Sequence, residues 1–249
     1  NVDRRIVFLL PYCDDFTAIG TTDVPIESTD QPVAISEAET EYLCEIANRY
    51  SARTVVPLDV LSSWSGVRAL FDDGRPNAAT VSRDYRLFVD AHGPPVLSVF
   101  GGKITTYRTL AEQALAKLGG WFPAMRSSWT ATKPLPGGDF GSVNFTALAQ
   151  TYQARYPALP MAWLRQLLRR HGTIAATILD DARSVEDLGE HFGGGLYERE
   201  VRHLVAREWA RTADDVLWRR TKAGLHASAD DRARLERAME HMAASTVAW

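Results

Sequence analysis

The strongest constraint on the fold is an apolar run that ends at two glycines and continues into a helical pattern. The run spans Val96–Phe100 and is followed by Gly101 and Gly102. Apolar residues then recur at helical spacing, at Leu110, Ala111, Ala114, Leu115 and Leu118. This order predicts a buried strand, a tight turn and the first residues of an amphipathic helix.

The turn after this strand carries groups that suit an anionic or electron-rich ligand. A helix N-terminus presents free backbone N–H groups and the positive end of the helix dipole. Lys103 adds a full positive charge there, and Thr105 and Thr106 add hydroxyl groups. Two interpretations stay open: a ligand-binding turn, or an ordinary joint between strand and helix whose glycines only allow the chain to turn.

Composition and motifs exclude several classes of protein and site. The 249 residues are 45% hydrophobic, as in globular proteins, and no apolar run approaches the roughly 20 residues that span a bilayer. The net charge of −3 predicts no long-range attraction to nucleic acid. The histidines show no H-x-x-x-H spacing, and Cys13 and Cys44 have no metal-ligand spacing, so we expect free thiols and no metal site. No G-x-G-x-x-G loop follows a strand, so the main dinucleotide-phosphate loop is not expected within these residues.

Three regions differ in local pattern and together predict an α+β fold. Residues 1–118 are rich in strand candidates, residues 119–141 have the glycine and proline content of a linker, and residues 142–249 read as an all-helical domain. Strands are expected at Ile6–Leu10, Phe16–Thr22, Leu61–Arg68, Ala79–Ser82 and Tyr85–Val89, with a first hairpin turn that contains Pro11, Asp14 and Asp15. Helices are expected after the capping-box residues Ser36–Glu39, and at Thr146–Tyr156, Met161–His171, Ile174–Asp180, Tyr197–Arg211, Asp214–Leu217 and Ala229 to the C-terminus.

The helical domain is predicted to fold by itself around a core that includes aromatic residues. Trp163, Trp209 and Trp218 fall on apolar helical faces, so we expect them partly or wholly inside. Arg219 and Arg220 lie among acidic residues, which favours intramolecular ion pairs over binding of nucleic acid.

Two arginines at the ends of predicted strands could clamp an anion. Arg68 ends one strand, and Arg83 follows another. A guanidinium group offers two parallel donors in a fixed geometry that matches phosphate or carboxylate. The alternative is surface ion pairing with Asp72, Asp73 or Asp84. Gly20–Asp23 ends a further strand with small and hydroxyl-bearing residues, and is either a ligand-lining edge or a turn.

Seven segments, in order, resemble one family: the FAD-dependent aerobic glycerol-3-phosphate dehydrogenases of bacteria and mitochondria. The segments cover nearly the whole chain, and the two longest are Leu97–Arg108 and Asp214–Lys222. The others are Ile19–Asp23, Ser65–Arg68, Ser82–Tyr85, Leu135–Gly138 and Asp187–Gly189. The chain departs from the family at Ala69, where proline commonly follows the arginine.

The resemblance implies an enzyme that uses FAD to oxidise glycerol 3-phosphate to dihydroxyacetone phosphate and passes the electrons to a membrane quinone. It implies that Arg68 and Arg83 bind the phosphate and hydroxyl end of the substrate, and that Thr21 and Thr22 line the cleft. It also implies that Lys103 is a catalytic residue beside the flavin. The implied flavin-binding residues are Gly101, Gly102, Lys103, Ile104 and Thr105. The implied location is cytoplasmic, peripheral at the inner face of the cell membrane.

The chain begins abruptly, inside a predicted strand, and the family's enzyme is about twice as long. We therefore expect a piece of that enzyme, in which residues 1–118 supply part of the substrate-binding sheet and the last strand and helix of the FAD domain. Such a piece is expected to be inactive by itself, and a homodimer could cover its unpaired sheet edges. Two other functions stay open. One is a non-catalytic helical interaction module, and the other is a related flavin oxidase of amines or amino acids, which the paired arginines disfavour.

Overall fold

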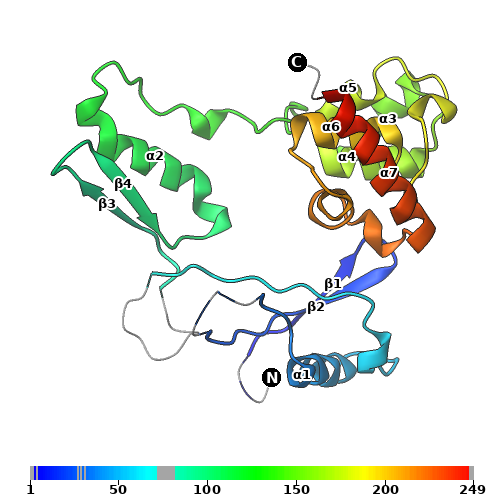
Figure 1. Ribbon diagram of the computed structural model, residues 1–249, viewed down its shortest axis with the longest axis horizontal. Helices are drawn as coiled ribbons and strands as arrows, with labels where there is room; N and C mark the ends of the chain where they lie inside the picture. The colour runs from blue at the N-terminus through cyan, green and yellow to red at the C-terminus, as the bar shows by residue number, and fades with distance from the viewer. Residues whose placement is uncertain are drawn as a thin grey trace. The chain divides into compact units, whose positions relative to one another are not determined.

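The computed structural model describes residues 3, 5–26, 28, 30, 32–71 and 82–246, and the structural statements below concern these residues. Contacts divide the chain into two compact units, Asn1–Lys133 and Pro134–Trp249 (Figure 1). The first unit holds two small sheets and two α-helices in its described part, and the second is helical. The fold is therefore α+β with a helical C-terminal region, as the sequence predicts.

The first sheet is a hairpin of β1 (Phe8–Tyr12) and β2 (Phe16–Gly20), which pair antiparallel. The turn between them is Cys13–Asp15. Pro11, predicted to lie in the turn, is instead within β1. Proline is tolerated there because β1 is an edge strand of a two-stranded sheet, where a missing N–H donor breaks no central ladder.

The helix α1 (Glu37–Asn48) begins at the predicted capping box. The Ser36 hydroxyl accepts the Glu39 N–H at 3.2 Å, and the Glu39 carboxylate accepts the Ser36 N–H at 2.9 Å. Such reciprocal bonds satisfy two donors that a helix start otherwise leaves unpaired. The inward face of α1 carries the only buried side chains among the described residues of the first unit: Leu43, Cys44, Ile46 and Ala47.

The second sheet is a hairpin of β3 (Arg86–Asp90) and β4 (Val96–Phe100), also antiparallel. The prediction that β4 is buried is wrong: none of its residues is buried, because its one strand neighbour is β3. On this sheet Phe88 and Phe100 contact each other, with ring centroids 5.8 Å apart, and both contact Phe71, at 6.1 and 6.3 Å.

Two further strand predictions have different outcomes. The segment 61–68 forms no strand and has no ladder partner among the described residues. Of the predicted strand Ala79–Ser82, residues 79–81 lie outside the described residues, and Ser82 is not in a strand.

The turn after β4 depends on its two glycines. Gly101 and Gly102 have φ of +73° and +103°, which side chains with a Cβ atom rarely adopt. A Cβ at Gly101 would also lie 3.1 Å from the backbone oxygen of Asp84 and 3.2 Å from the backbone nitrogen of Phe71. A single 3₁₀ turn, Ile104–Thr106, then leads into α2 (Tyr107–Leu118), so the helix begins slightly later than predicted.

The second unit contains two hydrophobic cores. The first lies among α3 (Phe145–Arg155), α4 (Met161–His171) and α5 (Ala175–Leu179). Gly172 ends α4 with φ of +55°, and a Cβ there would lie 1.8 Å from the carbonyl oxygen of Gly137. This close backbone approach ties the start of the unit to the end of α4.

The second core lies among α6 (Glu198–Arg207), a π-helical turn (Asp215–Arg220) and α7 (Ala229–Thr246). The π turn is closed by Thr221, whose N–H donates to the Val216 carbonyl at 3.1 Å, five residues back. The Thr221 hydroxyl donates to the same carbonyl at 2.7 Å. Residues of this core with no exposed area include Phe192, Leu196, Val201, Leu204, Val216 and Leu235.

The tryptophan predictions are correct at two of three positions. Trp163 is buried and Trp218 is partly buried, each against one of the two cores. Trp209 is 79% exposed. The reason is that α6 ends at Arg207, four residues before the predicted end, and Trp209 has a φ of 57° that takes it off the helical face.

Within the described part of the chain, none of the helices combines the length and apolar character needed to cross a bilayer.

Candidate functional site

Arg68 and Arg83 converge on a single carboxylate, that of Asp23. The Arg68 Nη1 atom is 2.7 Å from an Asp23 oxygen, and the Arg83 Nη2 atom is 3.9 Å from the other. Among the described residues their ion-pair partner is thus Asp23 rather than Asp84, while Asp72 and Asp73 lie outside those residues. Three separate segments of the first unit therefore bring two guanidinium groups to one anion.

The ion pairs of Asp23 are open to water. The side chains of Arg68, Arg83 and Asp23 are 43%, 46% and 41% exposed. Ion pairs this accessible to water contribute about 0–1 kcal/mol. The three charges sum to +1, so the cluster retains attraction for a phosphate dianion.

Thr21 and Thr22, predicted to line a cleft, lie just before this carboxylate and differ in their contacts. Thr21 is exposed. The Thr22 hydroxyl donates to a Glu39 carboxylate oxygen at 2.6 Å and thereby fastens the segment after β2 to the start of α1. This bond and the bonds from Ser36 lower the pKa of Glu39. In this chain Thr22 therefore positions the backbone that leads to Asp23.

The turn at residues 101–105 has the donors that the resemblance requires for a flavin. The first N–H groups of a helical segment have no acceptor inside the helix, and here they belong to the turn that begins at Ile104. The side chains of Lys103, Ile104 and Thr105 are exposed, Ile104 to 86%. A flavin's pyrimidine edge is rich in acceptors and its ring is apolar, so this combination of donors, cation and exposed apolar side chain fits that group.

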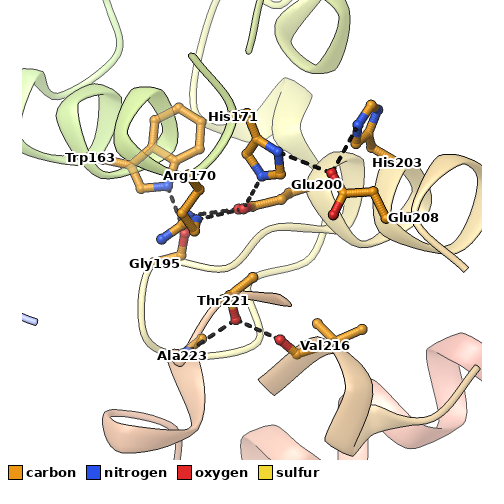
Figure 2. A network of polar contacts seen from close by, with 10 residues as sticks. All are labelled: Trp163, Arg170, His171, Gly195, Glu200, His203, Glu208, Val216, Thr221 and Ala223. Atoms are coloured by element: carbon orange, nitrogen blue, oxygen red, sulfur yellow. Dashed lines mark hydrogen bonds and ion pairs between the residues drawn. The ribbon is translucent and has the colours of Figure 1, made fainter. Parts of the chain in front are cut away.

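A buried polar network in the second unit was not foreseen from the sequence (Figure 2). Its centre is Glu200 on α6, whose side chain is 1% exposed. Glu200 accepts two hydrogen bonds from Arg170, from Nε at 2.7 Å and Nη2 at 2.8 Å. A third comes from the His171 Nε2 atom at 2.8 Å. Burial raises the pKa of Glu200, but the hydrogen bonds from His171 and the charge of Arg170 outweigh it, and the net shift is downward.

A second carboxylate, Glu208, lies on the other side of His171. One Glu208 oxygen is 3.6 Å from the His171 Nδ1 atom and 3.6 Å from the His203 Nε2 atom. The two imidazole rings are nearly perpendicular, at 83°, with centroids 5.6 Å apart. Burial lowers the pKa of His203, with a smaller contribution from the neighbouring His171.

The backbone of Glu208 is held by an arginine of the π turn. Arg220 donates to the Glu208 carbonyl from Nε at 3.1 Å and from Nη2 at 2.8 Å. Arg219 pairs with Asp215 at 3.1 Å. Arg220 also lies 3.9 Å from the same Asp215 carboxylate, so the prediction of intramolecular ion pairs for Arg219 and Arg220 is confirmed.

The network escaped sequence analysis because its members are far apart in the chain. Positions 170–171, 200–203 and 208 form no short ligand-spacing motif. The available signal was the pair Glu200 and His203, three residues apart and hence on one face of a helix. Asp23 was also missed as the arginines' partner, although it ends the Gly20–Asp23 segment that was singled out.

Comparisons with known proteins cover almost the whole chain. A family model described as FAD dependent oxidoreductase matches residues 1–108, and one described as the C-terminal domain of alpha-glycerophosphate oxidase matches residues 128–249. The chain is 46% identical to a glycerol-3-phosphate dehydrogenase of Pseudomonas aeruginosa over 94% of this chain and 46% of the relative.

Two further relatives are similar at the same level. A D-erythritol 1-phosphate dehydrogenase of Brucella abortus is 45% identical, and the aerobic glycerol-3-phosphate dehydrogenase of Escherichia coli is 42% identical. Each match covers 94% of this chain and 47% of the relative. The chain thus spans about half the length of the curated relatives it matches.

Proposed function

This chain belongs to the family of FAD-dependent oxidoreductases that includes the bacterial glycerol-3-phosphate dehydrogenases, and from that premise we propose that the whole protein oxidises glycerol 3-phosphate to dihydroxyacetone phosphate. The carrying observation is that Arg68 and Arg83 converge on Asp23. Two guanidinium groups at one point make a site for a group with several anionic oxygens, and a phosphate monoester meets that requirement.

In this proposal Arg68 and Arg83 bind the substrate's phosphate in place of the Asp23 carboxylate. Asp23 keeps the two guanidinium groups together until the phosphate arrives. Thr22, through its bond to Glu39, fixes the segment that carries Asp23. Thr21, exposed beside it, lines the cleft.

The turn at residues 101–105 holds the pyrimidine edge of FAD. When bound, FAD supplies a hydride acceptor for the carbon that bears the oxidised hydroxyl. Backbone N–H groups of the first helical turn and the Lys103 ammonium stabilise negative charge at that edge. Gly101 and Gly102, with positive φ, allow the tight turn between β4 and these donors.

Electron transfer and location complete the proposal. The electrons pass to a membrane quinone, and the protein is cytoplasmic and peripheral at the inner face of the cell membrane, as the family resemblance implies. A homodimer and the absence of any nucleic-acid partner belong to the same proposal, the latter supported by the net charge of −3.

A second substrate follows from one comparison. The relative that is 45% identical is a D-erythritol 1-phosphate dehydrogenase. Glycerol 3-phosphate and D-erythritol 1-phosphate share the phosphate that the arginines would bind and differ in the length of the polyol. The arginine pair therefore supports a phosphorylated polyol, and the polyol itself is decided by an assay with both compounds.

Steady-state kinetics of the whole enzyme test the proposal. Arg68→Ala should reduce kcat/KM for the phosphorylated substrate by about 10- to 150-fold, because a charge-assisted bond contributes roughly 1.5–3 kcal/mol. Arg83→Ala should act in the same direction. The matched control is Arg53→Ala, which removes an exposed arginine from the loop after α1. An unchanged kcat/KM in both site variants would show that the phosphate binds elsewhere.

A further inference from the structure

The His171, His203 and Glu208 side chains surround a point with the dimensions of a tetrahedral metal site. The three ligand atoms all lie within 4.8 Å of one another, and two of the separations are 3.6 Å. Metal–ligand bonds of about 2.0–2.1 Å in tetrahedral geometry place ligand atoms roughly 3.3–3.4 Å apart. Two pairs thus need to move by only a few tenths of an ångström, and the third, which is within 4.8 Å, would have to close further when an ion binds.

The hydrogen bonding of His171 leaves the correct nitrogen facing this point. A carboxylate only accepts hydrogen bonds, so the His171 Nε2 atom carries the proton in its 2.8 Å bond to Glu200. In the neutral ring the Nδ1 atom then carries a lone pair. This atom lies 3.6 Å from a Glu208 oxygen, beyond hydrogen-bond distance. Two electron-rich atoms held face to face in this way are stabilised by a cation between them.

Glu200 supplies the outer support that metal-bound histidines usually have. Such histidines donate their other ring N–H to a carboxylate, which fixes the tautomer and the ring orientation. Glu200 does this for His171, is 1% exposed and is itself held by Arg170. On the opposite side, Arg220 fixes the Glu208 backbone through its carbonyl.

Two helix ends at this point favour a cation. His171 is the last residue of α4, and Glu208 caps the C-terminus of α6. Helix C-termini carry partial negative charge and stabilise cations. Among the nearby side chains, Glu200 and Glu208 carry two negative charges and Arg170 and Arg220 two positive ones, and Arg207 at the end of α6 adds an exposed positive charge. The side-chain charges therefore do not attract a cation by themselves, and the site rests on the geometry of the three ligand atoms.

From this geometry we propose that the ends of α4 and α6 bind one divalent transition-metal ion of the Zn²⁺ type through His171 Nδ1, His203 Nε2 and a Glu208 oxygen. Two imidazoles and one carboxylate are a ligand set that Zn²⁺ uses, with water in the fourth position. Glu208, whose side chain is 36% exposed, is on the open side where that water enters. The ion cross-links the two helices and fixes the turn after α6.

The test is direct binding of Zn²⁺ to untagged protein that has been stripped with a chelator and dialysed. Competition with a chromophoric chelator measures affinity, and elemental analysis gives the stoichiometry. We expect one Zn²⁺ per chain. Loss of a group that only supports a metal-bound histidine costs about 10–100-fold in affinity. Loss of a ligand itself, in His203→Ala or Glu208→Gln, should therefore cost at least about 100-fold.

Matched variants separate a metal site from a set of ion pairs. His241→Ala removes an exposed histidine of α7 and should leave the affinity unchanged. Imidazole ¹⁵N shifts should move at Nδ1 of one histidine and Nε2 of another when Zn²⁺ is added. His171 is not substituted, because its loss removes one of the three hydrogen bonds to the buried Glu200 and would disturb the fold as well as the proposed site. Fewer than about 0.1 Zn²⁺ per chain, or wild-type affinity in both His203→Ala and Glu208→Gln, would overturn the proposal.

Discussion

Replacing Glu200 by glutamine should destabilise the helical unit far more than a surface substitution does. The carboxylate is 1% exposed and accepts three hydrogen bonds of 2.7–2.8 Å from Arg170 and His171. Glutamine keeps the shape of the side chain but loses its charge. Its NH₂ group replaces one carboxylate oxygen and cannot accept a hydrogen bond from Arg170 or His171. Arg170 then remains charged and unpaired, with only 15% of its side chain exposed.

The magnitude follows from this burial. Removing one partner of a buried ion pair costs roughly 3–5 kcal/mol. Because water reaches part of Arg170 and the glutamine oxygen still accepts one bond, we expect the lower end, about 3 kcal/mol. With a urea m-value of about 1–3 kcal/mol/M, the unfolding midpoint should fall by roughly 1–3 M.

Urea unfolding followed by circular dichroism at helical wavelengths, with a chelator present, measures this loss. The control is Glu236→Gln, which removes a surface pair between side chains 44% and 48% exposed. A pair this exposed to water contributes little to stability. If the loss in Glu200→Gln came within 1 kcal/mol of the control, the reasoning from buried charge would be refuted.

Four further predictions concern acidity, cofactor, architecture and substrate. Backbone N–H groups of Arg211 and Thr212 lower the pKa of Asp215 from 3.8 to about 2. The stability that the ionised Asp215 contributes is therefore complete above about pH 4 and is lost as the pH falls from about 4 to about 2. Asp215→Asn should flatten the pH dependence of the free energy of unfolding in that window. The 249-residue chain by itself should bind no stoichiometric FAD, since it has no G-x-G-x-x-G loop, and a flavin spectrum at one equivalent would contradict this. Limited proteolysis should leave a resistant fragment that begins near residues 125–145 and reaches the C-terminus, whereas survival of residues 1–118 with cuts in 146–225 would count against it. Arg68→Lys should restore only part of the activity lost in Arg68→Ala, because an ammonium cannot make the bidentate contact, and full recovery would point to a simple charge effect.

The elements that sequence predicts well are those whose signals are local. The Ser36–Glu39 capping box and the proline-bounded α4 (Met161–His171) are set by neighbouring residues, and both form where expected. The sequence predicts the bounds of β4, Val96–Phe100, correctly, but its burial wrongly. Burial depends on which other elements cover the strand, and a local pattern does not report that. The end of α6 was missed because a left-handed residue, Trp209, gives no composition signal.

The same division applies to the candidate site. Arg68, Arg83 and the glycine turn could be selected from strand ends and turn chemistry. Their convergence on Asp23 joins segments 45 residues apart in the chain, and no periodicity reports such a contact. The His171, Glu200 and Glu208 network is equally non-local, since it depends on how α4 packs on α6.

The π turn at Asp215–Arg220 determines how the second unit tolerates a change in chain length. A π turn holds one residue more per turn than an α-helix, so removal of one residue would let the segment wind as an ordinary α-helix. The wider turn accommodates the extra residue, so the residues after the deletion would keep their facing around the axis. Arg220, which binds the Glu208 carbonyl twice, would stay on the same side and move along the axis by about one helical rise, roughly 1.5 Å. A single-residue deletion here should therefore be tolerated better than one inside α4 or α6, where every later residue of the helix would turn by about 100°.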